Sequence, residues 1–167
     1  MGWYEVAQDS MRVTTRVITK KIEVAVTRRH VFHGEDPDRS LSRIGEAEGE
    51  LADLVVLSQA ATFERTLRDF MTRRADRLLG GDPLDLAIHA AVVSDIEYWR
   101  LVDRLVSVFK GQVEPIVLGQ VKPIVGYRNW VAHGRSTAEP PDGNVSPRMA
   151  FEPLTRFLIE AGIVDPP

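Results

Sequence analysis

The chain has 167 residues, the length of one compact domain that can bury a core without cross-links. It contains no cysteine, which excludes disulfides, iron–sulfur clusters and thiolate zinc sites, so any metal would need histidine and carboxylate ligands. No apolar stretch approaches the roughly 20 residues that span a bilayer, and the N-terminus lacks a signal-peptide pattern, so we expect a cytoplasmic protein without a membrane segment. The net charge of −3 neither favours nor excludes RNA, because a local basic patch can bind phosphate.

The N-terminal segment, residues 1–38, differs in composition from the rest of the chain. Residues 11–33 are rich in valine, isoleucine and threonine, whose branched side chains resist helix formation and favour strands. The alternation is imperfect, since Val17 and Ile18 are adjacent. The sequence predicts a short β hairpin or an appended arm here, then a polar turn in which Ser40 is the N-cap of the next element.

Residues 39–167 are predicted to form a separate, helical domain. The predicted helices combine apolar residues at helical spacing with Pro, Ser or Gly residues at their ends; they are 41–79 as one helix or two, 82–111, about 115 or 123 to 133, and 146–161. The fold class is therefore mainly all-α, a bundle of four or five helices with a short N-terminal hairpin or arm.

Three polar residues fall inside the apolar arcs when each helix is projected at about 100° per residue. They are Glu64, Asp95 and Arg128. A guanidinium keeps its proton, so an inward-facing Arg128 needs a carboxylate partner or a water-filled cleft. Glu64 is the predicted partner and Asp95 the reserve. The cluster is either a structural ion pair or part of a functional site, and the projection leaves both open.

The end of the first predicted helix is rich in arginine. Its basic residues are Arg65, Arg68, Arg73, Arg74 and Arg77, interleaved with acidic ones. Because their directions span a wide arc, the pattern indicates a solvated helix face and not an RNA-binding track.

The segment Arg128–Gly134 reads RNWVAHG. It resembles the signature of HEPN domains, in which an arginine, often followed by a polar residue, precedes a histidine by about four to six residues. With Phe63-Glu64 on an upstream amphipathic helix, the chain is most similar to the branch called RiboL-PSP-HEPN, over roughly residues 41–161. The resemblance implies a HEPN-like helical bundle.

The resemblance also implies an activity, metal-independent and cofactor-free cleavage of RNA to 2′,3′-cyclic phosphate and 5′-hydroxyl ends. His133 would be the general acid or base, Arg128 the phosphate clamp, and Asn129 the group that orients phosphate or imidazole, with Glu64 and Asp95 in support. These residue types suit the reaction, which needs a proton-transfer group and fixed positive charge.

Helix geometry indicates that one copy of the motif is incomplete. Asn129 and His133 are four residues apart and share a face, whereas Arg128 and His133 diverge by about 140°. A second copy across a two-fold axis would supply the missing group, as in the paired HEPN domains that the resemblance implies.

Several alternatives stay open. The chain is a toxin or defence effector with an antitoxin protein as partner, a non-catalytic RNA-binding or protein-interaction module of the same fold, or a plain helical scaffold. In HEPN toxins neutralised by nucleotidyltransferases a tyrosine follows the histidine by two residues, but here that position is Arg135, which puts that mode of neutralisation in doubt. In a structural interpretation, His133 is a polar residue at a helix end and Trp130 packs against a neighbour.

Overall fold

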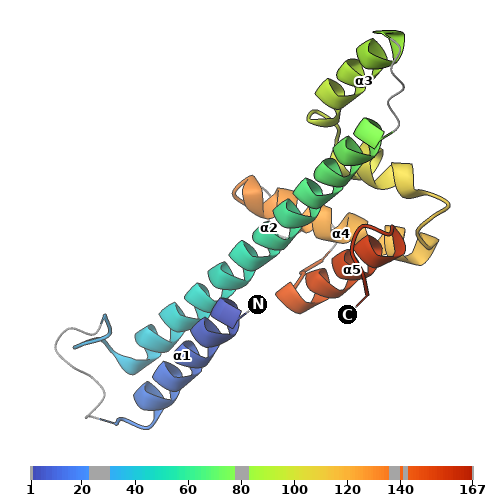
Figure 1. Cartoon of the computed structure of the whole chain (residues 1–167). Coiled ribbons are helices and arrows are strands. Elements are labelled where there is room, and N and C mark those ends of the chain that lie inside the picture. The colour runs from blue at the N-terminus through green and yellow to red at the C-terminus, as the bar shows by residue number, and fades with distance from the viewer. Residues whose placement is uncertain (1, 23–30, 78–82, 136–139, 141–142, 167) are drawn as a thin grey trace. The chain divides into compact units, whose positions relative to one another are not determined.

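A computed structural model describes residues 2–22, 31–77, 83–135, 140 and 143–166 (Figure 1). Its elements are α1 (Gly2–Thr19), α2 (Pro37–Arg77), α3 (Pro83–Ile96), a π-helical turn η2 (Leu101–Val106), a 3₁₀ turn η3 (Ser107–Phe109), α4 (Pro115–Ala132) and α5 (Pro147–Glu160). The described residues contain no strand, which confirms the predicted all-α class. Contacts group the chain into two compact units, Met1–Val55 and Val56–Pro167, divided within α2. None of the described helices has the length and apolar composition needed to cross a membrane.

The first unit contains α1, where the sequence predicted a hairpin or arm. That prediction is wrong for residues 11–19, which are helical. Threonine fits this helix because its hydroxyl bonds the carbonyl four residues earlier, as Thr14 Oγ1 does to Ser10 O at 2.9 Å. Tyr4 is buried, so packing of one face outweighs the modest strand preference of branched side chains. Residues 23–30 of the predicted strand lie outside the described residues.

The helix α2 is continuous and begins earlier than predicted. Asp36, and not Ser40, is its N-cap: Asp36 Oδ2 accepts hydrogen bonds from the N–H groups of Asp38 at 3.1 Å and Arg39 at 3.3 Å. Pro37 follows at the first helical position, where its missing N–H costs nothing. Ser40 lies within the first turn and is only 2% exposed.

The core of the second unit is centred on three phenylalanine rings. Phe157 on α5 is fully buried and meets Phe63 of α2 at a centroid distance of 5.2 Å and Phe109 of η3 at 5.4 Å, both edge to face. Val117 and Val121 of α4 are also fully buried in this core. Phe63 therefore fixes which face of α2 points inward.

The predicted helix 82–111 is interrupted. Its first part, α3, ends at Ile96, and Arg100 is extended with φ −64° and ψ 137° before η2 begins. The interruption is explained by a contact from another helix. Arg68 of α2 donates hydrogen bonds to the carbonyl oxygens of Ile96 and Trp99. A side chain thus satisfies carbonyls that a continuous helix would have bonded internally.

The last two predicted helices are confirmed. The helix α4 begins at Pro115 and contains Pro123 in its interior. Ser146 caps α5 by accepting the N–H of Met149 at 3.3 Å, and α5 ends before Gly162, whose φ is +64°. These two helices contact each other within the second unit.

Candidate functional site

The C-terminal end of α4 carries the segment RNWVAHG and closes with a defined cap. His133 is the C-cap residue. The N–H of Gly134 donates to Val131 O at 3.0 Å and that of Arg135 to Trp130 O at 2.9 Å, the paired bonds of a Schellman motif. Gly134 has φ +71°, which glycine adopts without strain. The cap therefore fixes the backbone on both sides of the histidine.

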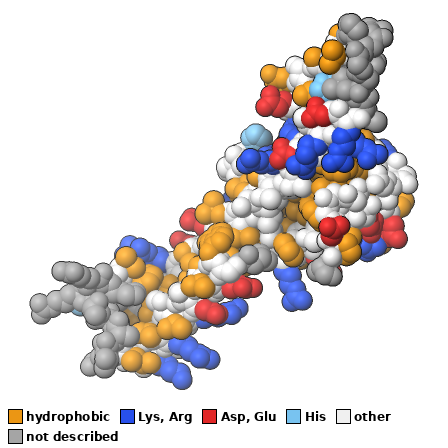
Figure 2. Space-filling model, in the orientation of Figure 1, with side chains coloured by type: hydrophobic (Ala, Val, Ile, Leu, Met, Phe, Trp, Pro, Cys, Tyr) orange, Lys and Arg blue, Asp and Glu red, His pale blue; other side chains and the backbone are white. Residues whose placement is uncertain are grey.

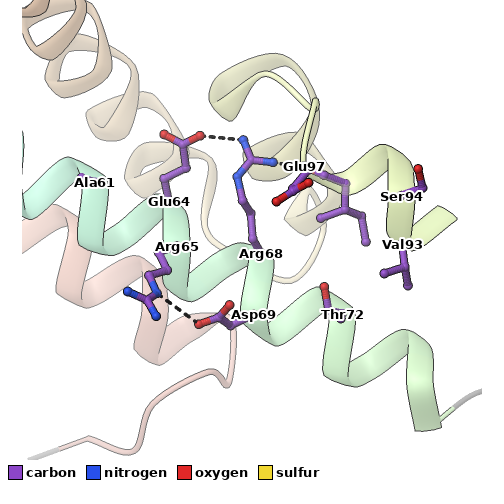
Figure 3. A pocket seen from close by; sticks show the side chains of 10 residues that line it. Ala61, Glu64, Arg65, Arg68, Asp69, Thr72, Val93, Ser94 and Glu97 are labelled. Atoms are coloured by element: carbon purple, nitrogen blue, oxygen red, sulfur yellow. Dashed lines mark hydrogen bonds and ion pairs between the residues drawn. The ribbon is translucent and has the colours of Figure 1, made fainter. Parts of the chain in front are cut away.

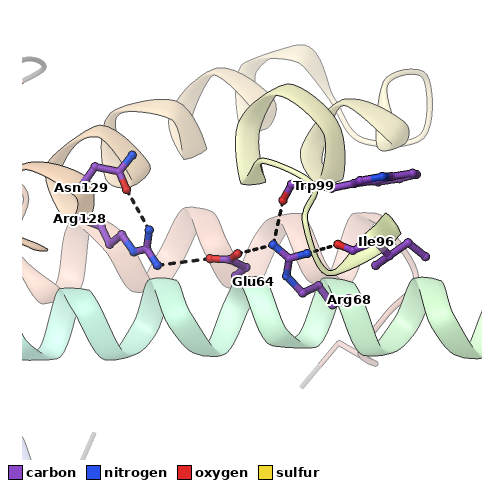
Figure 4. Close-up of polar contacts among 6 residues, drawn as sticks. All are labelled: Glu64, Arg68, Ile96, Trp99, Arg128 and Asn129. Atoms are coloured by element: carbon purple, nitrogen blue, oxygen red, sulfur yellow. Dashed lines mark hydrogen bonds and ion pairs between the residues drawn. The ribbon is translucent and has the colours of Figure 1, made fainter. Parts of the chain in front are cut away.

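Arg128 of α4 and Glu64 of α2 form an ion pair inside the second unit. Arg128 Nη2 lies 3.5 Å from Glu64 Oε2, and Figure 4 marks this pair with a dashed line. The side chains are 33% and 21% exposed, so both are partly withdrawn from water. Phe63 places Glu64 at the edge of the core, since it holds the neighbouring position of the same helix. The contact predicted from the helix projection is confirmed, and the roles of the two residues in catalysis stay a prediction.

Glu64 has a second and closer cationic partner, Arg68, one turn later on α2. Arg68 Nη2 donates to Glu64 Oε1 at 2.6 Å and to Trp99 O at 2.8 Å, and Nη1 donates to Ile96 O (Figure 4). The sequence indicated a solvated arginine here, which is wrong for Arg68 because its side chain is only 20% exposed. The signal that could have identified it is its spacing of four residues from Glu64.

The cluster of Arg68, Glu64 and Arg128 carries excess positive charge. One carboxylate is shared by two guanidinium groups, so one positive charge has no counter-charge within the cluster. Arg128 also donates from Nη1 to Asn129 Oδ1 at 2.9 Å. A guanidinium has five N–H groups, and donors of Arg128 remain for a further acceptor such as a phosphate oxygen.

Asn129 and His133 are both exposed at the end of α4. Ideal helix geometry places these two residues on one face and the Arg128 and His133 side chains about 140° apart. Within the described residues no hydrogen bond or ion pair joins the side chains of Arg128 and His133. One copy of the chain therefore presents its cation and its imidazole in different directions.

A second cation lies beyond the histidine. The guanidinium carbon of Arg135 is 5.6 Å from the centre of the Trp130 ring, a cation–π contact. Trp130 in turn meets the ring of buried Tyr127 at 5.6 Å. Trp130 thus packs against a neighbour, as its structural interpretation predicted.

Asp95 does not belong to this cluster. The predicted position of Asp95 inside an apolar arc is wrong, because the residue is exposed. The arc assumed one helix from Ile88 to Val106, and the interruption after Ile96 places Val106 on a separate turn. What reaches Arg68 from this region is backbone carbonyl oxygen and not a carboxylate.

A cavity of about 570 Å³ adjoins the Glu64–Arg68 pair on the side of α3 (Figure 3). Its lining includes Asp69 from α2 and Ser94 and Glu97 from the end of α3 and the turn after it. Figure 3 shows side chains of both charges around it, so the cavity favours no single charge of ligand.

No protein-family model matches the chain, and neither a curated protein nor a solved structure matches it.

Proposed function

We propose that the chain is a metal-independent endoribonuclease of HEPN type, which cleaves RNA to 2′,3′-cyclic phosphate and 5′-hydroxyl ends. The observation that carries the proposal is the shared carboxylate of Glu64, which balances only one of the two positive charges of Arg68 and Arg128. Arg128, the more weakly held of the two arginines, lies near the end of α4, which also carries the exposed imidazole of His133. A fixed cation and a proton-transfer group are the components that phosphodiester cleavage requires.

In the proposed reaction the ribose 2′-oxygen attacks phosphorus and the bond from phosphorus to the 5′-oxygen breaks. A base takes the proton of the 2′-hydroxyl, and an acid delivers a proton to the departing 5′-oxygen. Arg128 balances the negative charge that develops on the phosphoryl oxygens. His133 performs one of the proton transfers, and Asn129 orients the phosphate or the imidazole.

The proposed active form is a homodimer. The divergence of Arg128 and His133 means that one copy does not aim both groups at one phosphate. Two motifs related by a two-fold axis would bring the arginine of one copy toward the histidine of the other. A cytoplasmic toxin or defence effector, held in check by an antitoxin protein, is the biological setting that the proposed activity suits.

The experiment is cleavage of single-stranded RNA by the purified chain in EDTA, with analysis of the product ends. We expect cyclic phosphate ends from the wild type and loss of cleavage in Arg128→Ala and His133→Ala. Arg148→Ala and His33→Ala are matched controls, because both residues are exposed and lie outside the motif. Circular dichroism checks that every variant is folded. Cleavage that needs added metal, or that both motif variants retain, would contradict the proposal.

The alternative is a non-catalytic RNA-binding or protein-interaction module, favoured by the lack of a contact between Arg128 and His133 within one copy. Fluorescence anisotropy against salt separates the two. A binding module would bind RNA without turnover, and Arg128→Ala would lower the salt slope by about 0.7 for one lost phosphate contact. A chain that neither binds nor cuts RNA would be a protein-interaction domain or scaffold.

A further inference from the structure

The helix α1 carries an exposed apolar stripe. Trp3, Val6 and Val13 are 60%, 67% and 61% exposed. With Ser10 and Val17 they form a series spaced alternately by three and four residues, which we call the outer seam. This alternation is the pattern by which one helix packs along another in a two-stranded coiled coil.

The outer seam is distinct from the more buried face of α1. The covered face consists of buried Tyr4 and of partly buried residues at helical spacing from it: Ala7, Met11, Thr14 and Ile18. The two stripes are offset by one residue, or about 100° around the helix. Figure 2 shows hydrophobic side chains among acidic and basic ones on the surface where Figure 1 places α1. Trp3, Val6, Ser10 and Val13 of the outer seam are exposed to solvent, and Val17 is partly buried.

The charges beside the outer seam indicate what covers it. Asp9 and Arg16 each stand one position before a seam residue, on the same flank of the helix. In an antiparallel pair of identical helices these flanks meet, and Asp9 of one copy faces Arg16 of the other, twice by symmetry. The pattern therefore fits a second, antiparallel copy of this chain.

We propose that two copies of the chain associate through the outer seams of their α1 helices, in antiparallel orientation. Trp3 is the large aromatic anchor, and the valines of the seam pack against those of the second copy. Asp9 is held in the single copy by an exposed pair with Arg12 at 3.1 Å, which is easily exchanged for Arg16 of the second copy. Because α1 has only 18 residues, the interface falls near the lower limit of about 1,000 Å² and the dimer is concentration-dependent.

Analytical ultracentrifugation of the full chain over a range of concentrations tests the proposal. We expect a monomer–dimer equilibrium whose dissociation constant rises by roughly tenfold or more in Val13→Asp, since a carboxylate in the seam is desolvated without a partner. Glu5→Gln is the control, because Glu5 is exposed on α1 away from the seam. Circular dichroism confirms that both variants stay helical.

A charge exchange tests the orientation. Asp9→Arg places like charges opposite each other in the antiparallel dimer and weakens it, and adding Arg16→Asp restores opposite charges and the dimer. A wild type that stays monomeric at every concentration would overturn the proposal. It would do so even if the monomer bound lipid vesicles. So would a dimer that tolerates both Val13→Asp and Asp9→Arg. The inference uses α1 alone, so its outcome is independent of whether the chain cuts RNA.

Discussion

The guanidinium of Arg128 meets the carboxylate of Glu64 at 3.5 Å, although the two residues are 64 positions apart in the sequence. The same carboxylate accepts a shorter bond, 2.6 Å, from Arg68 on its own helix. Arg128 is therefore the more weakly held of the two arginines and also the more exposed, at 33% against 20%. A weakly held guanidinium can turn part of its donor set to a phosphate without leaving a buried charge unpaired.

Replacing Glu64 with glutamine keeps the shape of the side chain and removes the negative charge that the two arginines share. We expect the free energy of unfolding to fall by about 1 kcal/mol, because a partly exposed charged hydrogen-bond pair is lost. RNA binding at low salt should become tighter as local positive charge rises. Urea unfolding and fluorescence anisotropy measure the two effects, with Glu50→Gln on the exposed surface of α2 as control. Weaker RNA binding by a folded Glu64→Gln variant would count against Arg128 as a phosphate ligand.

Arg68→Met tests the link between α2 and the interrupted helix. The variant loses the donors to the carbonyl oxygens of Ile96 and Trp99, and we expect a loss of about 1–3 kcal/mol in stability. Hydrogen exchange should accelerate in the amides around residues 96–101. Arg65→Met is the matched control, since Arg65 is 85% exposed and pairs with Asp69 only at 3.8 Å. Equal stability of the two variants would show that the carbonyl contacts contribute little.

Gly134→Ala tests the cap that positions the histidine. An alanine at φ +71° is strained by about 1 kcal/mol, although its Cβ would meet no neighbour within 4 Å. We expect lower thermal stability and, under the proposed function, slower RNA cleavage, because His133 adjoins the strained position. Gly119→Ala inside α4 is the control and should be neutral or stabilising, since that site is also open. A Gly134→Ala variant as stable and active as the wild type would contradict this role of the cap.

The contribution of the Glu160 carboxylate to the stability of the fold is expected to depend on pH. Its carboxylate accepts the backbone N–H of Glu114 at 3.0 Å and Arg156 Nε at 2.7 Å, and these contacts lower the pKa of Glu160 below its usual value. A lowered folded-state pKa stabilises the fold above the unfolded-state pKa, and this stabilisation is lost as pH falls through the folded-state value. Glu160→Gln should therefore lower Tm more at pH 7 than near pH 3.

The control for this variant is Glu152→Gln, an exposed glutamate of the same helix, which should leave Tm unchanged at both values of pH. The same Tm difference between wild type and Glu160→Gln at pH 7 and pH 3 would show that the carboxylate charge is not the cause.

The sequence predicted the structure best where residues typical of helix ends agree with the helical spacing of apolar residues. Pro115 marks the start of α4 and Ser146 the start of α5. The ends of these helices are marked by Gly134 and Gly162, which adopt positive φ. The Glu64–Arg128 contact was predictable because a permanent cation inside an apolar arc requires a carboxylate.

The errors come from contacts that no local pattern contains. Residues 11–19 have strand-like side chains, yet they form a helix whose covered face begins with buried Tyr4. The interruption after α3 depends on Arg68, which reaches Ile96 O from 28 positions away in the sequence. That interruption also removes the helix phase on which the placement of Asp95 rested.

The proposed metal-independent cleavage of RNA by His133 and Arg128 is tested most directly by the rate of RNA cleavage in EDTA by the wild type and His133→Ala. We expect cyclic phosphate products from the wild type and a rate lower by about 10²–10⁴-fold in the folded variant, the usual contribution of a general acid or base. Equal rates for the two proteins, or no cleavage of RNA by the wild type, would contradict it.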